Sequence, residues 1–191
     1  LPAAITDGPD LAGRKIVIRN SAATNSKDLT IQESDGTFVA RVGRDSLVEI
    51  CFTAQGKPLC LTQEFSSTAD KPSSNSADSV IVDAITGYLI IPTMVVISAA
   101  SAVDPGATGN LELKGGTVVL GTFTEVDLAA NKAAVIYPIG VATNGSPDTY
   151  APIDNLAVST DITLKTNTAP GQVLIVKTYY KVIKQNIADM S

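Results

Sequence analysis

Hydrophobic and polar residues alternate most strictly between Asp154 and Ile183. Every second residue over 158–164 is apolar or threonine, and the residues between them are polar or charged. Alternation returns over 174–182, with Leu174, Val176, Thr178, Tyr180 and Val182 on one face and Ile175, Lys177, Tyr179 and Lys181 on the other. Strict alternation is typical of a strand with one buried face. The two runs are separated by residues 167–171, which contain asparagine, proline and glycine, the residues of turns. The pattern therefore predicts a closing antiparallel hairpin with one wet face.

The first third of the chain carries a similar pattern. Lys15–Arg19 alternates as a strand, and Val48, Ile50 and Phe52 share one side of another. Between them, Asp35–Gly36 is the strongest short signal for a two-residue hairpin turn. With that dipeptide at the tip, apolar residues fall on one face of both strands. The predicted opposed pairs are Glu33 with Phe38, Ile31 with Ala40, and Leu29 with Val42.

A second predicted hairpin concerns the two cysteines. With Gln55–Gly56 at its tip, Phe52 opposes Leu59 and Cys51 opposes Cys60. Cysteines at such a non-hydrogen-bonded pair are close enough for a cross-strand disulfide. The alternative is two reduced cysteines that pack as small apolar residues, which the absence of a visible export signal favours.

Composition divides the chain into parts. Residues 66–79 are almost wholly small and polar, with Pro72 among them, and are predicted to be a linker. We expect an arm without regular structure over 1–13, a small β module over 14–65, and a larger domain over 80–191.

The larger domain reads as a set of short strands. Tyr88–Ser98 is a long apolar run that predicts a strand buried on both faces, with Pro92 breaking or bulging it. Val126–Ala134 is the only segment with a helical pattern, and Thr143–Pro152 reads as a long loop. About seven or eight strands at turn-punctuated spacing predict an antiparallel β-sandwich or jelly roll. The fold class expected for the whole chain is all-β.

Charge and composition change the picture of partners. Charged residues make up 17% of the chain, against about 25% in typical soluble domains. So few charges predict that apolar surface is covered in an assembly. The net charge of −5, without a basic run, argues against nucleic acid as a partner. No apolar stretch approaches the roughly 20 residues of a membrane span, so no membrane partner is expected.

The chain contains no histidine. That removes the commonest general base and metal ligand, and it excludes Ser/His/Asp and Cys/His catalysis. Asp148, Asp154 and Asp161 match no calcium loop. Asp45 and Asp127 are candidate bases beside which no nucleophile can be placed. We therefore predict no enzymatic activity, no catalytic residues, no metal site and no cofactor.

Residues 121–135 (GTFTEVDLAANKAAV) and 156–183 (LAVSTDITLKTNTAPGQVLIVKTYYKVI) together resemble the β-sandwich domain of small virion proteins of tailed bacteriophages. The segments KIVIRN, LTIQESDGT and VGRDSLVEICFTAQG resemble the small modules that such proteins carry in front. The resemblance implies a capsid cement, or decoration, protein that sits as a homotrimer between capsomers. Its implied partners are further copies of itself and the major capsid protein. Its implied location is the capsid surface of a virion assembled in the host cytoplasm.

The leading hypothesis is thus a structural protein that binds the outside of a phage capsid and stabilises it. Candidate interface residues are Ile5 and Leu11 of the arm, and Ile175 and Tyr179 on the outward face of the closing strand. The alternative is a tail-associated or receptor-binding protein that recognises cell-surface glycan. In that alternative, residues 144–150 would supply the contacts, because Tyr150 there, like Tyr179, has a ring on which a sugar can stack.

Overall fold

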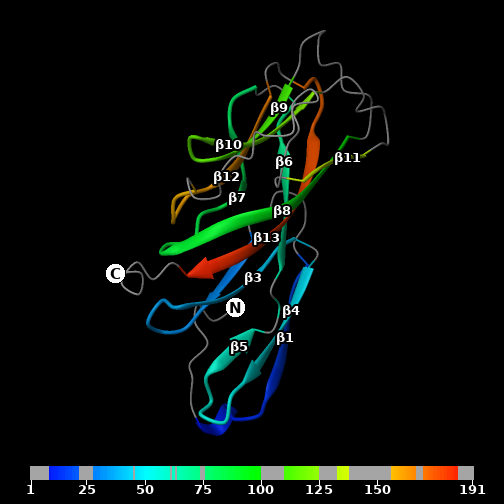
Figure 1. Cartoon of the computed structure of the whole chain (residues 1–191). Coiled ribbons are helices and arrows are strands. Elements are labelled where there is room, and N and C mark those ends of the chain that lie inside the picture. The colour runs from blue at the N-terminus through cyan, green and yellow to red at the C-terminus, as the bar shows by residue number, and fades with distance from the viewer. Residues whose placement is uncertain are drawn as a thin grey trace. The chain divides into compact units, whose positions relative to one another are not determined.

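A computed structural model describes residues 9–21, 28–44, 46–60, 62, 64–73, 76–99, 110–124, 133–137, 156–166 and 170–184. The chain divides into two compact units, Leu1–Ser67 and Thr68–Ser191 (Figure 1). Strands and their connections make up nearly all of the described residues, which confirms the all-β prediction.

The smaller unit contains two antiparallel sheets, β1-β4-β5 and the hairpin β2-β3. Its elements are η1 (Pro9–Leu11, one turn of 3-10 helix), β1 (Lys15–Asn20), β2 (Leu29–Gln32), β3 (Phe38–Val42), β4 (Ser46–Phe52) and β5 (Pro58–Cys60). The predicted strands at 15–19 and 48–52 are confirmed, and Val48, Ile50 and Phe52 are buried together. Phe38 packs edge-on against Phe65 with ring centroids 5.8 Å apart.

The first hairpin pairs partly as predicted. Leu29 opposes Val42 and Ile31 opposes Ala40, but Gln32 rather than Glu33 opposes Phe38, because a bulge interrupts the register. The turn differs too. The N–H of Gly36 donates to Glu33 O at 3.0 Å, and Gly36 has a φ of 87°. This is a three-residue loop that closes with a left-handed glycine, not the two-residue turn expected from Asp-Gly.

The second hairpin uses the same loop, and the predicted register is wrong by one residue. The N–H of Gly56 donates to Thr53 O at 2.8 Å, and Gly56 has a φ of 75°. Cys60 therefore opposes Ile50, and Cys51 opposes Leu59. Because side chains alternate between faces, the two cysteines point to opposite sides of the sheet. Both are free thiols in the structure, and the cross-strand pair proposed for a disulfide does not form in this register.

The predicted linker at 66–79 contains regular structure. β6 spans Phe65–Lys71, so the division between the units falls within a strand. After it, the fully buried Lys71 donates from Nζ to Ala77 O at 2.7 Å and to Ser79 Oγ at 3.2 Å. Two further bonds hold the same connection: Thr166 N–H to Ser76 O, and Gly171 N–H to Ser73 O. The small, polar residues between β6 and β7 therefore belong to a connection held by hydrogen bonds.

The larger unit is a β-sandwich of two four-stranded antiparallel sheets, β10-β9-β12-β7 and β11-β8-β13-β6 (Figure 1). Its further strands are β7 (Ser79–Val82), β8 (Tyr88–Ala99), β9 (Asn110–Gly115), β10 (Val118–Thr124), β11 (Ala133–Ile136), β12 (Ile162–Thr166) and β13 (Leu174–Lys184). The inner faces supply its core. That core includes Ile90, Val95, Ile97, Leu111, Leu113, Ile162, Leu164, Leu174, Val176 and Tyr180.

The predicted closing hairpin is wrong in its pairing. The second run is strand β13, whereas only residues 162–164 of the first run lie in β12 and residues 158–161 precede it; each strand buries the predicted face. However, β12 pairs with β7 and β9, whereas β13 pairs with β8. Residues 167–173 therefore lead from one sheet to the other. Two strands that bury one face each satisfy the same sequence pattern whether they lie side by side or across a core.

β8 is a twelve-residue strand, and its register against β13 shifts beside Pro92. The predicted bulge is thus confirmed. The prediction that β8 is buried on both faces is not confirmed, because the outward residues of this strand are only half-buried.

The helix expected over Val126–Ala134 is contradicted at its end, where Ala133 and Ala134 begin β11; residues 125–132 lie outside the described residues. The loop Thr143–Pro152 also lies outside them. In the part of the chain that the structure describes, no helix has the length and apolar character to cross a membrane.

Candidate interaction surfaces

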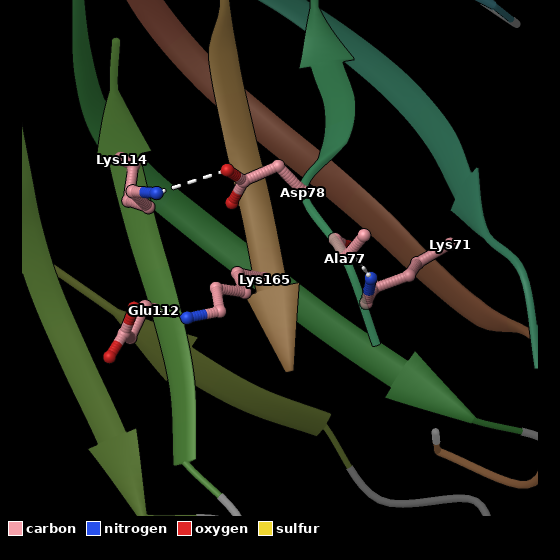
Figure 2. Close-up of polar contacts among 6 residues, drawn as sticks. All are labelled: Lys71, Ala77, Asp78, Glu112, Lys114 and Lys165. Carbon is pink, nitrogen blue, oxygen red and sulfur yellow. Dashed lines mark hydrogen bonds and ion pairs between the residues drawn. The ribbon is translucent and has the colours of Figure 1, made fainter. Parts of the chain in front are cut away.

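The outward face of β10-β9-β12-β7 carries paired charges beside two exposed valines, Val80 and Val119. We call it the paired-charge face and define it by Asp78, Glu112, Lys114, Thr163 and Lys165. Lys114 Nζ lies 3.0 Å from Asp78 Oδ2, and Lys165 Nζ lies 3.7 Å from Glu112 Oε2 (Figure 2). Lys165 and Glu112 are directly opposed across β12 and β9, the geometry in which opposite charges stabilise a sheet.

The outward face of β11, β8 and β13 is different in character. We call it the apolar face. Alternation along β13 and its register with β8 and β11 place these residues on it: Leu89, Ile91, Met94, Val96, Val135, Ile175, Tyr179 and Ile183. Ile175 and Ile183 are 44% and 48% exposed. Contiguous exposed apolar residues on a sheet mark an interaction site more often than scattered ones do.

Two lysines, Lys177 and Lys181, project from the same face. Both are exposed, and Lys177 Nζ lies 5.2 Å from the centre of the Tyr179 ring, a cation–π contact. β8, β11 and β13 contain no acidic residue. Among the described residues, no carboxylate forms an ion pair with either lysine.

The predicted interface residues divide between described and undescribed parts. Ile175 and Tyr179 both lie on the apolar face, and Leu11 is half-buried in η1. Ile5 lies outside the described residues. A role for these residues at an interface stays a prediction.

Sequence reasoning missed the β8 contribution to the apolar face. Leu89, Ile91, Met94 and Val96 were part of a run expected to be covered on both sides. The signal was present, because a strand with apolar residues at nearly every position has two faces to cover. What was missing was the finding that the described part of the chain covers only one of them.

A third surface is the outward face of β1-β4-β5 in the smaller unit. Its exposed apolar residues are Val17, Leu47 and Leu59. Lys15 crosses from β1 to bond Glu49 on β4 at 2.8 Å. The hydrogen bond to Glu49, together with the attraction of that carboxylate, raises the pKa of Lys15 above its ordinary value of 10.5.

The acidic residues singled out for chemistry show no shared site. Asp161 Oδ1 accepts a hydrogen bond from the Ala84 N–H at 2.6 Å and so holds a loop. Asp45, Asp127, Asp148 and Asp154, like Tyr150, lie outside the described residues. Within the described ranges, no three metal-binding side chains gather.

Comparison with known proteins adds no relative: neither models of protein families nor curated protein sequences match the chain.

Proposed function

We propose that the chain is a structural virion protein that binds the outer surface of a phage capsid and stabilises it as a cement protein. The proposal includes a homotrimer that contacts the major capsid protein. The observation that supports it is the apolar face, a sheet surface with exposed isoleucines on β13. Surfaces of this kind gain binding free energy from buried apolar area when another protein covers them.

The residues of the apolar face suggest how attachment would work. Ile175 and Ile183 are apolar anchors on β13, and Tyr179 between them offers a large ring with a polar tip. Residues of this kind dominate the energy of many protein interfaces. Many copies bound to one capsid would together restrain its subunits, so modest affinity at each site is sufficient.

Binding to empty capsids tests the proposal. Capsids assembled from the major capsid protein of the phage proposed to carry this chain are mixed with the purified chain and sedimented. We expect saturable co-sedimentation and a higher temperature of capsid disassembly. Ile175→Thr with Ile183→Thr should weaken attachment about tenfold, because each replaces an apolar anchor while keeping a β-branched side chain.

The matched control is Val80→Thr with Val119→Thr. These valines are 45% and 42% exposed on the other sheet of the same unit, so their replacement removes similar area from the paired-charge side. Attachment should be unchanged. A chain that never co-sediments with capsids and never alters their disassembly temperature contradicts the proposed function.

The N-terminal arm offers a second test. Removal of residues 1–12 should weaken capsid attachment and leave the free protein folded, because the contact area that Ile5 and Leu11 would add to the capsid is lost. Circular dichroism checks the fold, and co-sedimentation checks attachment. Unchanged attachment would show that Ile5 and Leu11 are not anchors.

A further inference from the structure

We infer that the apolar face docks on a protein surface that combines apolar side chains with carboxylates. The inference specifies the chemistry of the partner at the proposed attachment surface and in that respect rests on the proposed function. It starts from two lysines, Lys177 and Lys181, that stand among apolar side chains on one face of β13.

The first step is a comparison with the other sheet of the same unit. There, Lys114 and Lys165 each have a carboxylate of this chain within ion-pair distance. On the apolar face, no carboxylate among the described residues pairs with Lys177 or Lys181. A partner that covers this face would desolvate the two ammonium groups, and such burial is tolerated only where opposite charge meets them.

The second step concerns a second copy of the chain. β8, β11 and β13 carry lysines and no acidic residue, and Asp70 on the neighbouring β6 is half-buried. Two copies packed face to face through these strands would bring lysines together without counter-charges. Like charges at an interface oppose association. Charge complementarity therefore favours a different, acidic surface as the occupant.

The third step separates a protein from an anionic membrane. A surface that inserts into a bilayer projects apolar tips beyond a rim of cations. Here the lysines lie within the apolar rows, between Ile175, Tyr179 and Ile183, and the neighbouring residues of β8 are half-buried by the sheet itself. A face with cations among its apolar residues is complementary to a protein surface that presents carboxylates among apolar side chains.

The experiment uses a displayed library of random twelve-residue peptides as the probe. The intact chain is the target, and Ile175→Thr with Ile183→Thr is the depletion target, so that only binders of the apolar face remain. We expect the retained peptides to combine Asp or Glu with apolar residues. Lys177→Glu with Lys181→Glu should weaken them about tenfold, and higher salt should weaken them as well.

Controls define the outcomes that contradict the inference. Val80→Thr with Val119→Thr must retain the peptides. The inference is wrong if no peptide depends on the apolar face, if the retained peptides lack carboxylates, or if charge reversal leaves them unaffected. Vesicles of phosphatidylserine that bind through the same residues would assign the face to a membrane. Dimers seen in sedimentation velocity and abolished by Ile175→Thr with Ile183→Thr would assign it to a second copy.

The peptide test and the capsid test fail separately. If acidic, apolar peptides bind the apolar face but the chain has no affinity for capsids, the inference is retained and the proposed function is contradicted. If capsid attachment is unchanged in Lys177→Glu with Lys181→Glu and also in Ile175→Thr with Ile183→Thr, the proposed function is retained and the inference is contradicted.

Discussion

The two outward faces of the larger unit belong to sheets of four strands each, yet the lysines on them have different partners. On the paired-charge face, Lys114 meets Asp78 and Lys165 meets Glu112. On the apolar face, Lys177 has a tyrosine ring beside it and no carboxylate among the described residues. The lysines of the paired-charge face meet carboxylates of the same chain, whereas those of the apolar face meet none among the described residues. This difference in charge pairing supports the proposed binding surface.

The largest expected effect compares two isoleucines on paired strands. Ile97 is fully buried on the inner face of β8, and Ile175 is 44% exposed on the apolar face of β13. Ile97→Ala should lower the free energy of unfolding by about 3 kcal/mol through transfer and cavity terms, and Ile175→Ala by about 1 kcal/mol or less. Urea denaturation of the free chain measures both. Equal losses would mean that the apolar face is covered in the isolated chain.

A smaller effect tests the connection that carries Asp78 to the paired-charge face. Lys71 Nζ donates to Ala77 O, as Figure 2 shows, and to Ser79 Oγ, so that it bonds on either side of Asp78. Lys71→Met should cost about 2 kcal/mol, because two hydrogen bonds from a charged donor are lost. It should also speed hydrogen exchange at Ala77–Ser79 and proteolysis at 72–78. The control is Lys177→Met on the apolar face, which should change neither.

The ion pair itself has a smaller effect. A double-mutant cycle with Asp78→Asn and Lys114→Met should give a coupling free energy of about 0.5 kcal/mol at low salt, since the pair is partly exposed. The coupling should fall as ionic strength rises. A coupling of zero at low salt would mean that the paired-charge face is no better matched in charge than the apolar face.

The smallest effect is a pH dependence in the smaller unit. Folding raises the pKa of Lys15 through its bond to Glu49, so this pair stabilises the fold fully below the ordinary pKa of 10.5 and loses that contribution as pH rises through the higher folded value. The difference in urea midpoint between the wild type and Glu49→Gln should therefore shrink above about pH 10.5. A difference that grows there would reverse the assigned sign.

The sequence predicted the strands and their buried faces better than it predicted which strands pair with one another. Alternation located β1, β4, β12 and β13, because burial of one face leaves a period of two. The same alternation does not indicate which strand lies alongside, so β12 and β13 were wrongly predicted to pair as a hairpin. β6 escaped notice because a strand at the end of a sheet pairs through its backbone and needs no apolar rhythm.

Turn length was the second limit. Asp35–Gly36 and Gln55–Gly56 fit both a two-residue turn and a three-residue loop that ends with left-handed glycine. One residue of difference moves every side chain beyond the turn to the other face, which separated Cys51 from Cys60. At the apolar face, Ile175 and Tyr179 were identified because they broke the polar rhythm of β13, whereas the outward row of β8 broke no rhythm.

The placement of β12 and β13 has a consequence for synthesis. β12 lies between β9 and β7, and β13 lies between β8 and β6, so each is a central strand that follows both of its neighbours in sequence. While the ribosome adds the intervening residues, neither sheet of the larger unit can close. During that interval β8 is not paired with β13. A nascent chain with an unpaired apolar strand is prone to aggregation. Translation that slows before β12 should therefore increase the demand for chaperones, whereas slowing after β13 should not.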